Sequence, residues 1–196
     1  MQKSRGASML IAFEGTDGSG LSTQSKLLAE WLESEGYTVY LTKEPTTGEI
    51  GKLIRRVLRK EIEVSDATLA LLFAADRAWH TKIIVERIEK GEIVISDRYR
   101  LSSYAYQSLT LDLEWVVMIN RYSITPDLTF VIETPPEVSL ERIKQRNNGI
   151  ELFEELEKLE KISRNFRKVA EGNVVFIDGN RSIEEVFGEV RDKILI

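Results

Sequence analysis

The chain has 196 residues, of which 42% are hydrophobic and none is cysteine, and its formal net charge is −5. The length suits a single domain, and the lack of cysteine excludes disulfides and thiolate metal sites and fits a reducing cytoplasm. No apolar run reaches the roughly 18 residues that would span a membrane. Basic residues are spread along an acidic chain, which argues against a nucleic-acid-binding surface.

Five short apolar runs alternate with helical patterns, an order typical of a parallel sheet with crossover helices. Almost every strand residue is apolar, as expected when helices cover both faces of the sheet. We therefore expect an α/β domain over 9–196, after a disordered tail at 1–8. The expected strands are 9–13, 38–42, 93–96, 128–132 and 174–177, and the expected helices are 22–35, 49–60, 66–90, 101–122, 137–146, 151–171 and 182–194.

A glycine-rich loop follows the first strand and precedes a helix, which is the setting of the Walker A phosphate-binding motif. Glycines let backbone N–H groups approach a polyphosphate, and the N-terminus of the next helix favours the same anion. We predict that the whole loop binds ATP and that its serine, Ser22, is a ligand of Mg²⁺. The loop reads Gly15-Thr16-Asp17-Gly18-Ser19-Gly20-Leu21-Ser22-Thr23.

Position 21 of this loop departs from the motif, which has lysine there. The lysine ammonium contacts the β- and γ-phosphates and offsets charge during phosphoryl transfer. Leu21 offers neither a charge nor a donor. The alternative is that the loop merely links the strand to the helix. We favour a phosphate loop whose positive charge comes from elsewhere in the chain.

Four more segments are informative, and with the loop they stand in the order of one known family. They are Thr42-Lys43-Glu44-Pro45, then Leu72-Phe73-Ala74-Ala75-Asp76-Arg77-Ala78 with His80, then Asp97-Arg98-Tyr99, and then Ser102-Ser103 with Ala105-Tyr106-Gln107. On these segments the chain resembles the thymidylate kinase family over most of residues 9–190. The resemblance implies a three-layer P-loop kinase fold, a five-stranded parallel sheet flanked by helices, with a small helical lid.

Two residues of the third helix have the spacing of a base-binding pair. Phe73 and Arg77 lie four residues apart and so share one helix face. The resemblance implies that Phe73 stacks on thymine and that Arg77 donates to its O4 atom. A core phenylalanine beside a surface arginine is the alternative. We expect His80, on the same helix, to be a structural histidine with no catalytic role.

Asp97 and Arg98 end a buried strand, where acids that order Mg²⁺ through water are usually found. A helix N-cap is the alternative role for Asp97. The Arg98 guanidinium suits a nucleotide phosphate because it binds phosphate bidentately, and the resemblance assigns it to the acceptor monophosphate. By the same resemblance the dTMP site comprises Asp17, Glu44, Phe73, Arg77, Arg98, Ser103, Tyr106, Gln107 and Phe153.

Residues 141–154 correspond to the lid, and Asn147-Asn148-Gly149 breaks its helix. Arg142 and Arg146 lie four residues apart and reach one phosphate or adenine from the same side, unless they are solvated surface arginines. Leu152 stands where the family often has arginine, so a second cation is absent. Arg181 follows the last strand, and by resemblance it contacts adenine. The candidates to replace the missing charge are Arg142, Arg146, Lys144 and Lys43.

The function these residues indicate is ATP-dependent, Mg²⁺-dependent phosphorylation of dTMP to dTDP by in-line transfer. Asp17, Arg98, Arg142 and Arg146 are the expected catalytic residues, and the missing cations predict slow turnover. The resemblance also implies a homodimer, paired through apolar faces of the third and fourth helices. Two alternatives stay open: a nucleotide-binding paralogue with impaired catalysis, and a kinase of a related nucleotide such as dUMP.

Overall fold

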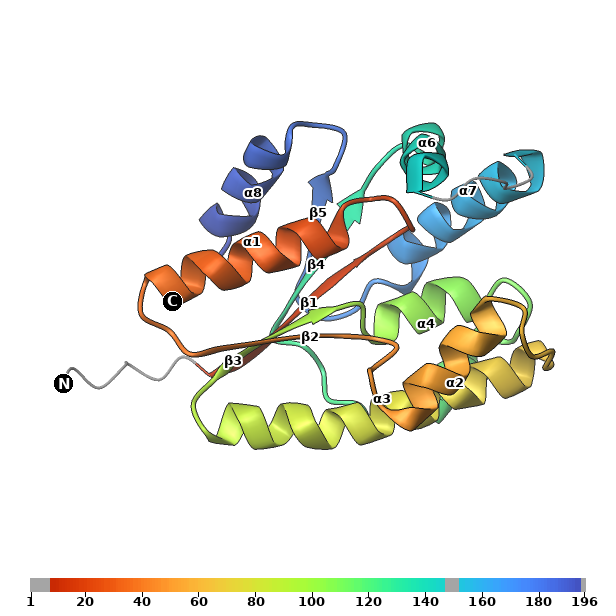
Figure 1. The fold of residues 1–196 in the computed structure, drawn as a ribbon, viewed down its shortest axis with the longest axis horizontal. Coiled ribbons are helices and arrows are strands. Elements are labelled where there is room, and N and C mark those ends of the chain that lie inside the picture. Colours follow the sequence, from red (N-terminus) through yellow and green to blue (C-terminus); the bar gives the residue numbers. More distant parts are fainter. Residues whose placement is uncertain (1–7, 147–151, 195–196) are drawn as a thin grey trace.

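The computed structural model describes residues 8–146 and 152–194, and in these ranges the chain forms five strands and eight helices (Figure 1). The strands are β1 (Met9–Gly15), β2 (Val39–Lys43), β3 (Ile93–Asp97), β4 (Leu128–Glu133) and β5 (Val174–Asp178). The helices are α1 (Leu21–Ser34), α2 (Glu49–Leu58), α3 (Asp66–Glu89), α4 (Arg100–Gln107), α5 (Leu113–Ile119), α6 (Pro136–Arg146), α7 (Leu152–Val169) and α8 (Ile183–Asp192).

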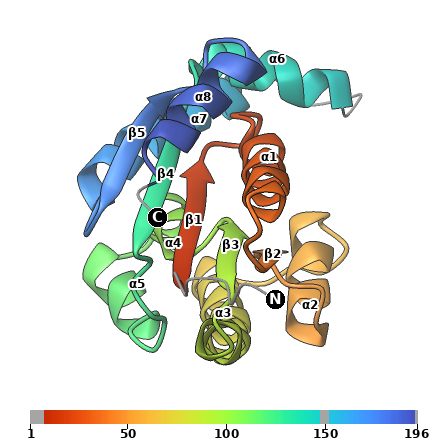
Figure 2. The same cartoon turned by 90° about the vertical axis from the view of Figure 1, so that its left-hand side faces the viewer.

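All the strand pairs are parallel, and the strands lie in the order β2-β3-β1-β4-β5. The sheet is covered on both faces (Figures 1 and 2). Ile11 and Phe13 of β1 pack in the core beneath α1 and α8, whereas Leu10 and Ala12 face the opposite side and α3. The α4, α5 and α7 helices complete that second layer. The predicted three-layer α/β class is therefore confirmed.

The expected single helix over 101–122 is wrong, because two helices, α4 and α5, occupy this range. Backbone N–H groups of Leu109 and Thr110 donate to the carbonyls of Tyr106 and Gln107, which closes the end of α4. A new helix then starts at Asp112, whose side chain accepts from the Trp115 N–H at 2.8 Å. Asp112 is thus an N-cap, a role that aspartate commonly takes.

Each strand also runs one or two residues further at its carboxyl end than the apolar pattern indicates. The added residues are mostly polar, and they include Lys43, Asp97 and Glu133. In open parallel sheets, ligands bind beyond the carboxyl ends of the strands. The sequence thus loses its strand pattern where the candidate site begins. None of the helices described here has the length and apolar character that a membrane-spanning helix needs.

Candidate active site

The phosphate loop lies against α6, and its conformation needs glycine at two places. Gly18 and Gly20 have φ values of +82° and +101°, which side chains rarely tolerate. A Cβ atom on Gly18 would lie 2.5 Å from the carbonyl oxygen of Ser139. Gly20 is the N-cap of α1 and carries no capping side chain, so the first N–H groups of that helix are left for a ligand.

Leu21 borders the pocket around the loop, but its side chain packs into the core. Its side chain is 5% exposed and packs in the cluster beneath α1, together with Phe13 and Leu28. The first residue of the helix therefore stabilises the packing of the loop against the sheet. The charge that a lysine would bring to this position is absent.

Ser22 and Asp97 meet at the mouth of the loop, because β3 lies next to β1. The Ser22 Oγ donates to the Asp97 Oδ2 at 2.5 Å. Both line a pocket of about 240 Å³ around the loop. Hydroxyl and carboxylate oxygens are the hard ligands that Mg²⁺ prefers, and Mg²⁺ usually takes its other ligands from phosphate and water. Among the described residues, no group of three or more histidine or acidic side chains is arranged to hold a metal ion by itself.

Arg98 connects the loop to the end of β3. Its backbone is left-handed, with φ at +71°, a conformation that costs a non-glycine residue of order 1 kcal/mol or more. The guanidinium donates to the Gly15 carbonyl at 2.8 Å, to Ser102 Oγ at 3.0 Å and to Asp17 Oδ1 at 2.7 Å. Asp17 and Arg98, predicted as separate site residues, thus form one ion pair at the phosphate loop.

Glu14 of β1 holds the residues next to Arg98 in place, and it was not among the site residues predicted from the sequence. It accepts from the Tyr99 N–H at 3.1 Å and from Ser102 Oγ at 2.5 Å. Burial raises the pKa of Glu14 to about 7, although the Ser102 hydrogen bond and the charges of Arg98 and Arg77 act in the opposite direction. One signal in the sequence was available, since Glu14 is the only charged residue in an otherwise apolar strand.

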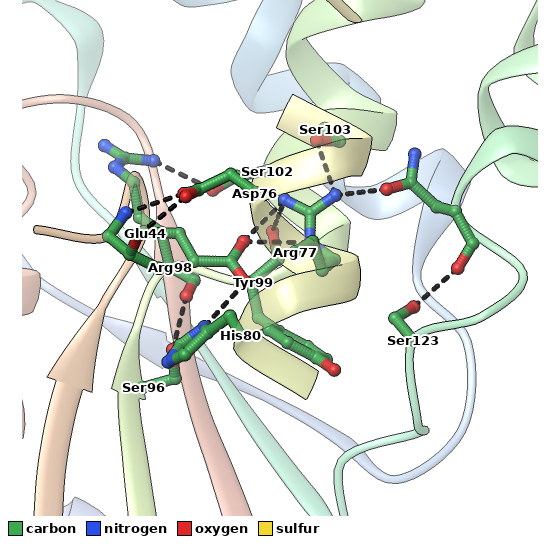
Figure 3. A network of polar contacts seen from close by, with 12 residues as sticks. Glu44, Asp76, Arg77, His80, Ser96, Arg98, Tyr99, Ser102, Ser103 and Ser123 are labelled. Carbon is green, nitrogen blue, oxygen red and sulfur yellow. Dashed lines mark hydrogen bonds and ion pairs between the residues drawn. The ribbon is translucent and has the colours of Figure 1, made fainter. Parts of the chain in front are cut away.

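Arg77 lies at the centre of a buried polar network (Figure 3). Its side chain is 2% exposed, its Nε donates to Glu44 Oε2 at 2.8 Å, and its Nη2 lies 2.7 Å from the same oxygen in an ion pair. Nη1 donates to Ser103 at 2.8 Å and to Asn120, and Nη2 also donates to the Tyr99 carbonyl at 3.2 Å. Every nitrogen of the guanidinium therefore already has a partner. A contact between Arg77 and a base carbonyl requires one of these bonds to be exchanged.

His80 is buried and both of its ring nitrogens have partners, as expected of a structural histidine. It is 1% exposed, its Nδ1 lies 2.9 Å from Glu44 Oε1, and its Nε2 lies 2.9 Å from Thr42 Oγ1. Glu44 is consequently shared by Arg77 and His80 on α3. The carboxylate pairs with these two side chains, and Glu44 also lines the pocket around the phosphate loop.

A second pocket, of about 450 Å³, adjoins the loop between α3 and α4. Phe73 lines one side of it, and Tyr106 and Gln107 line another, together with Arg98 and Asp17. The Tyr106 hydroxyl accepts from the Asp17 N–H at 3.0 Å. The Gln107 Oε1 is buried and has no hydrogen-bond partner among the described residues. The pocket therefore combines an aromatic wall and a guanidinium, with a buried, unpaired amide oxygen in one of its lining residues, and its volume suits a small-molecule ligand.

Comparisons of the sequence with known proteins agree on one family. Residues 13–190 match the sequence model of a family described as thymidylate kinase. A probable thymidylate kinase of Pyrococcus horikoshii is 43% identical, over 92% of each chain. Probable thymidylate kinases of Thermococcus kodakarensis and Methanocaldococcus jannaschii are 44% and 42% identical, over 93% of this chain and 95% and 93% of theirs. The chain belongs to the thymidylate kinase family. It is accordingly an enzyme of the nucleoside monophosphate kinase class.

The structure brings together most of the residues predicted for this thymidylate kinase site. The loop, Asp97 and Arg98 surround the smaller pocket, while residues of α3 and α4 form the larger one. Arg142 lies beside the loop, since its Nη1 and Nη2 donate to the Gly18 and Gly179 carbonyls at 3.3 and 3.4 Å. Arg181 is occupied differently: it pairs with Glu189 and donates to the Asp178 carbonyl at 3.1 Å.

Part of the predicted lid lies outside the described residues. This holds for Asn147-Asn148-Gly149 and for the side chains of Arg146, Leu152 and Phe153. Arg55 of α2 is a cation that the sequence did not single out. It lines the phosphate-loop pocket and donates through Nη1 to the Pro45 carbonyl at 2.9 Å. Its place on an amphipathic helix, far from any motif, left no signal.

Proposed function

We propose that this thymidylate kinase family member transfers the γ-phosphoryl group of ATP to dTMP and releases dTDP and ADP. The observation that carries the proposal is the continuity of the two pockets: Asp17 and Arg98 line both of them. A donor phosphate in the loop and an acceptor phosphate at Arg98 would then meet at one place. Positioning of this kind supplies most of the catalysis in phosphoryl transfer.

On the donor side, the chain contributes the backbone N–H groups of residues 15–23 and the start of α1. When Mg²⁺ is bound, it neutralises charge on the phosphate oxygens, and Ser22 and Asp97 are the residues that would hold it. Arg142 of α6 lies next to the loop at Gly18, and its guanidinium would add positive charge near the transferred group.

On the acceptor side, Arg98 binds the monophosphate and Phe73 stacks on the base. Gln107 lines this pocket, and its buried, unpaired Oε1 would turn toward the base and accept from N3–H, which thymine presents and cytosine lacks. Tyr106 fixes the position of Asp17 through the loop N–H and closes the sugar side of the pocket. Arg77 orders Ser103 and Asn120 around the base and reaches O4 only if one of its bonds is exchanged.

The test is a coupled assay of ADP release with dTMP, dUMP, dCMP and thymidine as acceptors. We expect turnover with dTMP, weaker turnover with dCMP, and none with thymidine, which lacks the phosphate that Arg98 would hold. Gln107→Leu should reduce the preference for dTMP over dCMP by about tenfold. Tight binding of dTMP without ADP release would contradict the proposal and favour a non-catalytic nucleotide-binding protein.

We also propose that the enzyme pairs as a homodimer through α3 and α5. Leu71 and Trp79 on α3 are 49% and 55% exposed, and Met118 on α5 is 55% exposed. The two helices that carry these side chains are in contact and lie next to each other (Figure 2). Exposed apolar patches of this kind mark association sites. Light scattering should give twice the mass of 22.4 kDa, and Trp79→Glu should give the monomer. A monomeric wild type overturns this proposal.

A further inference from the structure

The phosphate loop lacks its lysine, and the first two residues of α1 offer no positive charge in its place. Leu21 is buried in the core, and the next residue, Ser22, is bound to Asp97. A polyphosphate carries several negative charges, and the N–H groups of the loop are neutral donors. The positive charge must therefore come from a different element that faces the same pocket.

Three cations line the pocket around the loop, and they differ in what they already bind. Arg98 donates to Gly15, Asp17 and Ser102. Arg55 donates to the Pro45 carbonyl. Lys43 is exposed, and across the described ranges its ammonium has no ion pair and no hydrogen bond. Among the described residues it is the cation of this pocket whose donors are all free, whereas Arg55 has one of its five donors in use.

The alternation of side chains along β2 places Lys43 on the face of the sheet that carries α1 and the phosphate loop. Val39 packs with the core beneath α1, whereas Tyr40 packs with the core beneath α3. Thr42 likewise faces α3, where it meets His80. Successive residues of a strand point to opposite faces. Lys43 therefore lies on the same face as Val39, which is the face covered by α1 and the phosphate loop.

The register of the sheet places Lys43 next to the metal-binding oxygens. Lys43 pairs with Asp97 of the neighbouring strand, and Asp97 accepts from Ser22. Neighbouring strands lie roughly 5 Å apart, and the flexible four-carbon stem of lysine spans that separation. Lys43 also lines another cavity, distinct from the two pockets described above, which has a volume of about 590 Å³ and is lined by Ser22 as well. Its ammonium therefore has free space beside the loop.

We propose that Lys43 supplies the charge that Leu21 does not, by binding the β- and γ-phosphate oxygens of ATP from β2. The inference rests on the proposed use of ATP, and it names the residue that makes an altered loop functional. Lysine suits this role as a compact charge with three donors that can follow the phosphate as it moves. Lys43 ends a strand whose backbone is paired with β3, and this pairing holds it next to the loop.

The test compares Lys43→Met with a matched control, Lys26→Met. Lys26 of α1 lines the neighbouring cavity, but it is paired with Glu30 at 3.5 Å. Titration calorimetry with Mg²⁺ and ATP should show binding that is roughly ten- to a hundredfold weaker for Lys43→Met. Binding of AMP, which lacks the β- and γ-phosphates, and of dTMP should be unchanged. The Lys26→Met variant should match the wild type throughout.

A double-mutant cycle with Leu21→Lys then asks whether the two positions serve one purpose. Leu21→Lys should add little affinity for ATP in the wild type, and it should restore much of the lost affinity in Lys43→Met. An unchanged ATP affinity in Lys43→Met, or the same gain from Leu21→Lys in both backgrounds, would overturn the inference.

The two proposals fail in different ways. A wild type that binds ATP through Lys43 but releases no ADP with dTMP contradicts the proposed function alone. A chain that phosphorylates dTMP at the same rate and with the same ATP affinity after Lys43→Met contradicts the role of Lys43 alone. Both measurements use the full chain, and the exposed Lys43 side chain can be replaced without loss of a buried contact.

Discussion

The buried carboxyl of Glu14 should make the fold less stable as the pH rises. Burial raises its pKa from the ordinary value of 4.5 to about 7 in the folded chain. Below pH 4.5 the group is protonated in both states and has no effect. Between 4.5 and about 7 the unfolded chain ionises while the folded chain stays protonated, so stability falls, and above that range the loss is complete. The loss amounts to roughly 3 kcal/mol, or about 6–12 °C in Tm for a chain of this size.

Glu14→Gln removes the titration and keeps an oxygen that can accept from the Tyr99 N–H. Chemical denaturation at several pH values between 4.5 and 8 gives the free energy of unfolding of both proteins. The difference between variant and wild type should move in favour of the variant by about 3 kcal/mol across this range. Glu86→Gln, at an exposed position of α3, is the control and should show no such trend. A difference that is the same at every pH would refute the reasoning.

Three further substitutions test the loop, the buried network and the metal site. Gly18→Ala should weaken ATP binding by tenfold or more in calorimetry, because a Cβ at a φ of +82° would lie 2.5 Å from the Ser139 carbonyl. Glu44→Gln should lower the free energy of unfolding by about 3 kcal/mol in denaturant, because it leaves the Arg77 charge buried without its partner. Asp97→Asn should raise the Mg²⁺ concentration for half-maximal turnover by about tenfold, and an unchanged requirement would remove Asp97 from the metal site.

The sheet could be predicted because its strands are short, apolar and separated by helical patterns. Leu10 to Phe13 are fully buried, so both faces of β1 had to be apolar. The break between α4 and α5 was harder, since the apolar spacing continues through it and only Asp112 marks the new start. Local hydrogen bonds of Leu109 and Thr110 decide this break, and a periodic pattern does not contain them.

The residues of the candidate site could be predicted where a motif is local. Their partners could not be predicted where these come from distant segments of the chain. The loop and the pair Phe73 and Arg77 follow from spacing within one element. The pairing of Arg77 does not, because Glu44 and Asn120 lie 33 and 43 residues away in the chain. Glu14 likewise owes its raised pKa to burial, and the hydrogen bond from Ser102, 88 residues further on, offsets only part of that rise. Long-range packing decides which donors are left for a ligand.

The exchange of lysine for leucine at position 21 couples stability to the placement of charge. A fully buried leucine contributes about 2 kcal/mol through burial, and Leu21 makes this contribution where the phosphate loop meets the sheet. A lysine there would have to leave the core to reach a phosphate, so Leu21→Lys should lower stability even if it binds ATP. The charge can be provided without that loss only by a residue that is already exposed beside the loop. Lys43 at the end of β2 meets this condition, because its side chain is exposed while the backbone of its strand is fixed by β3.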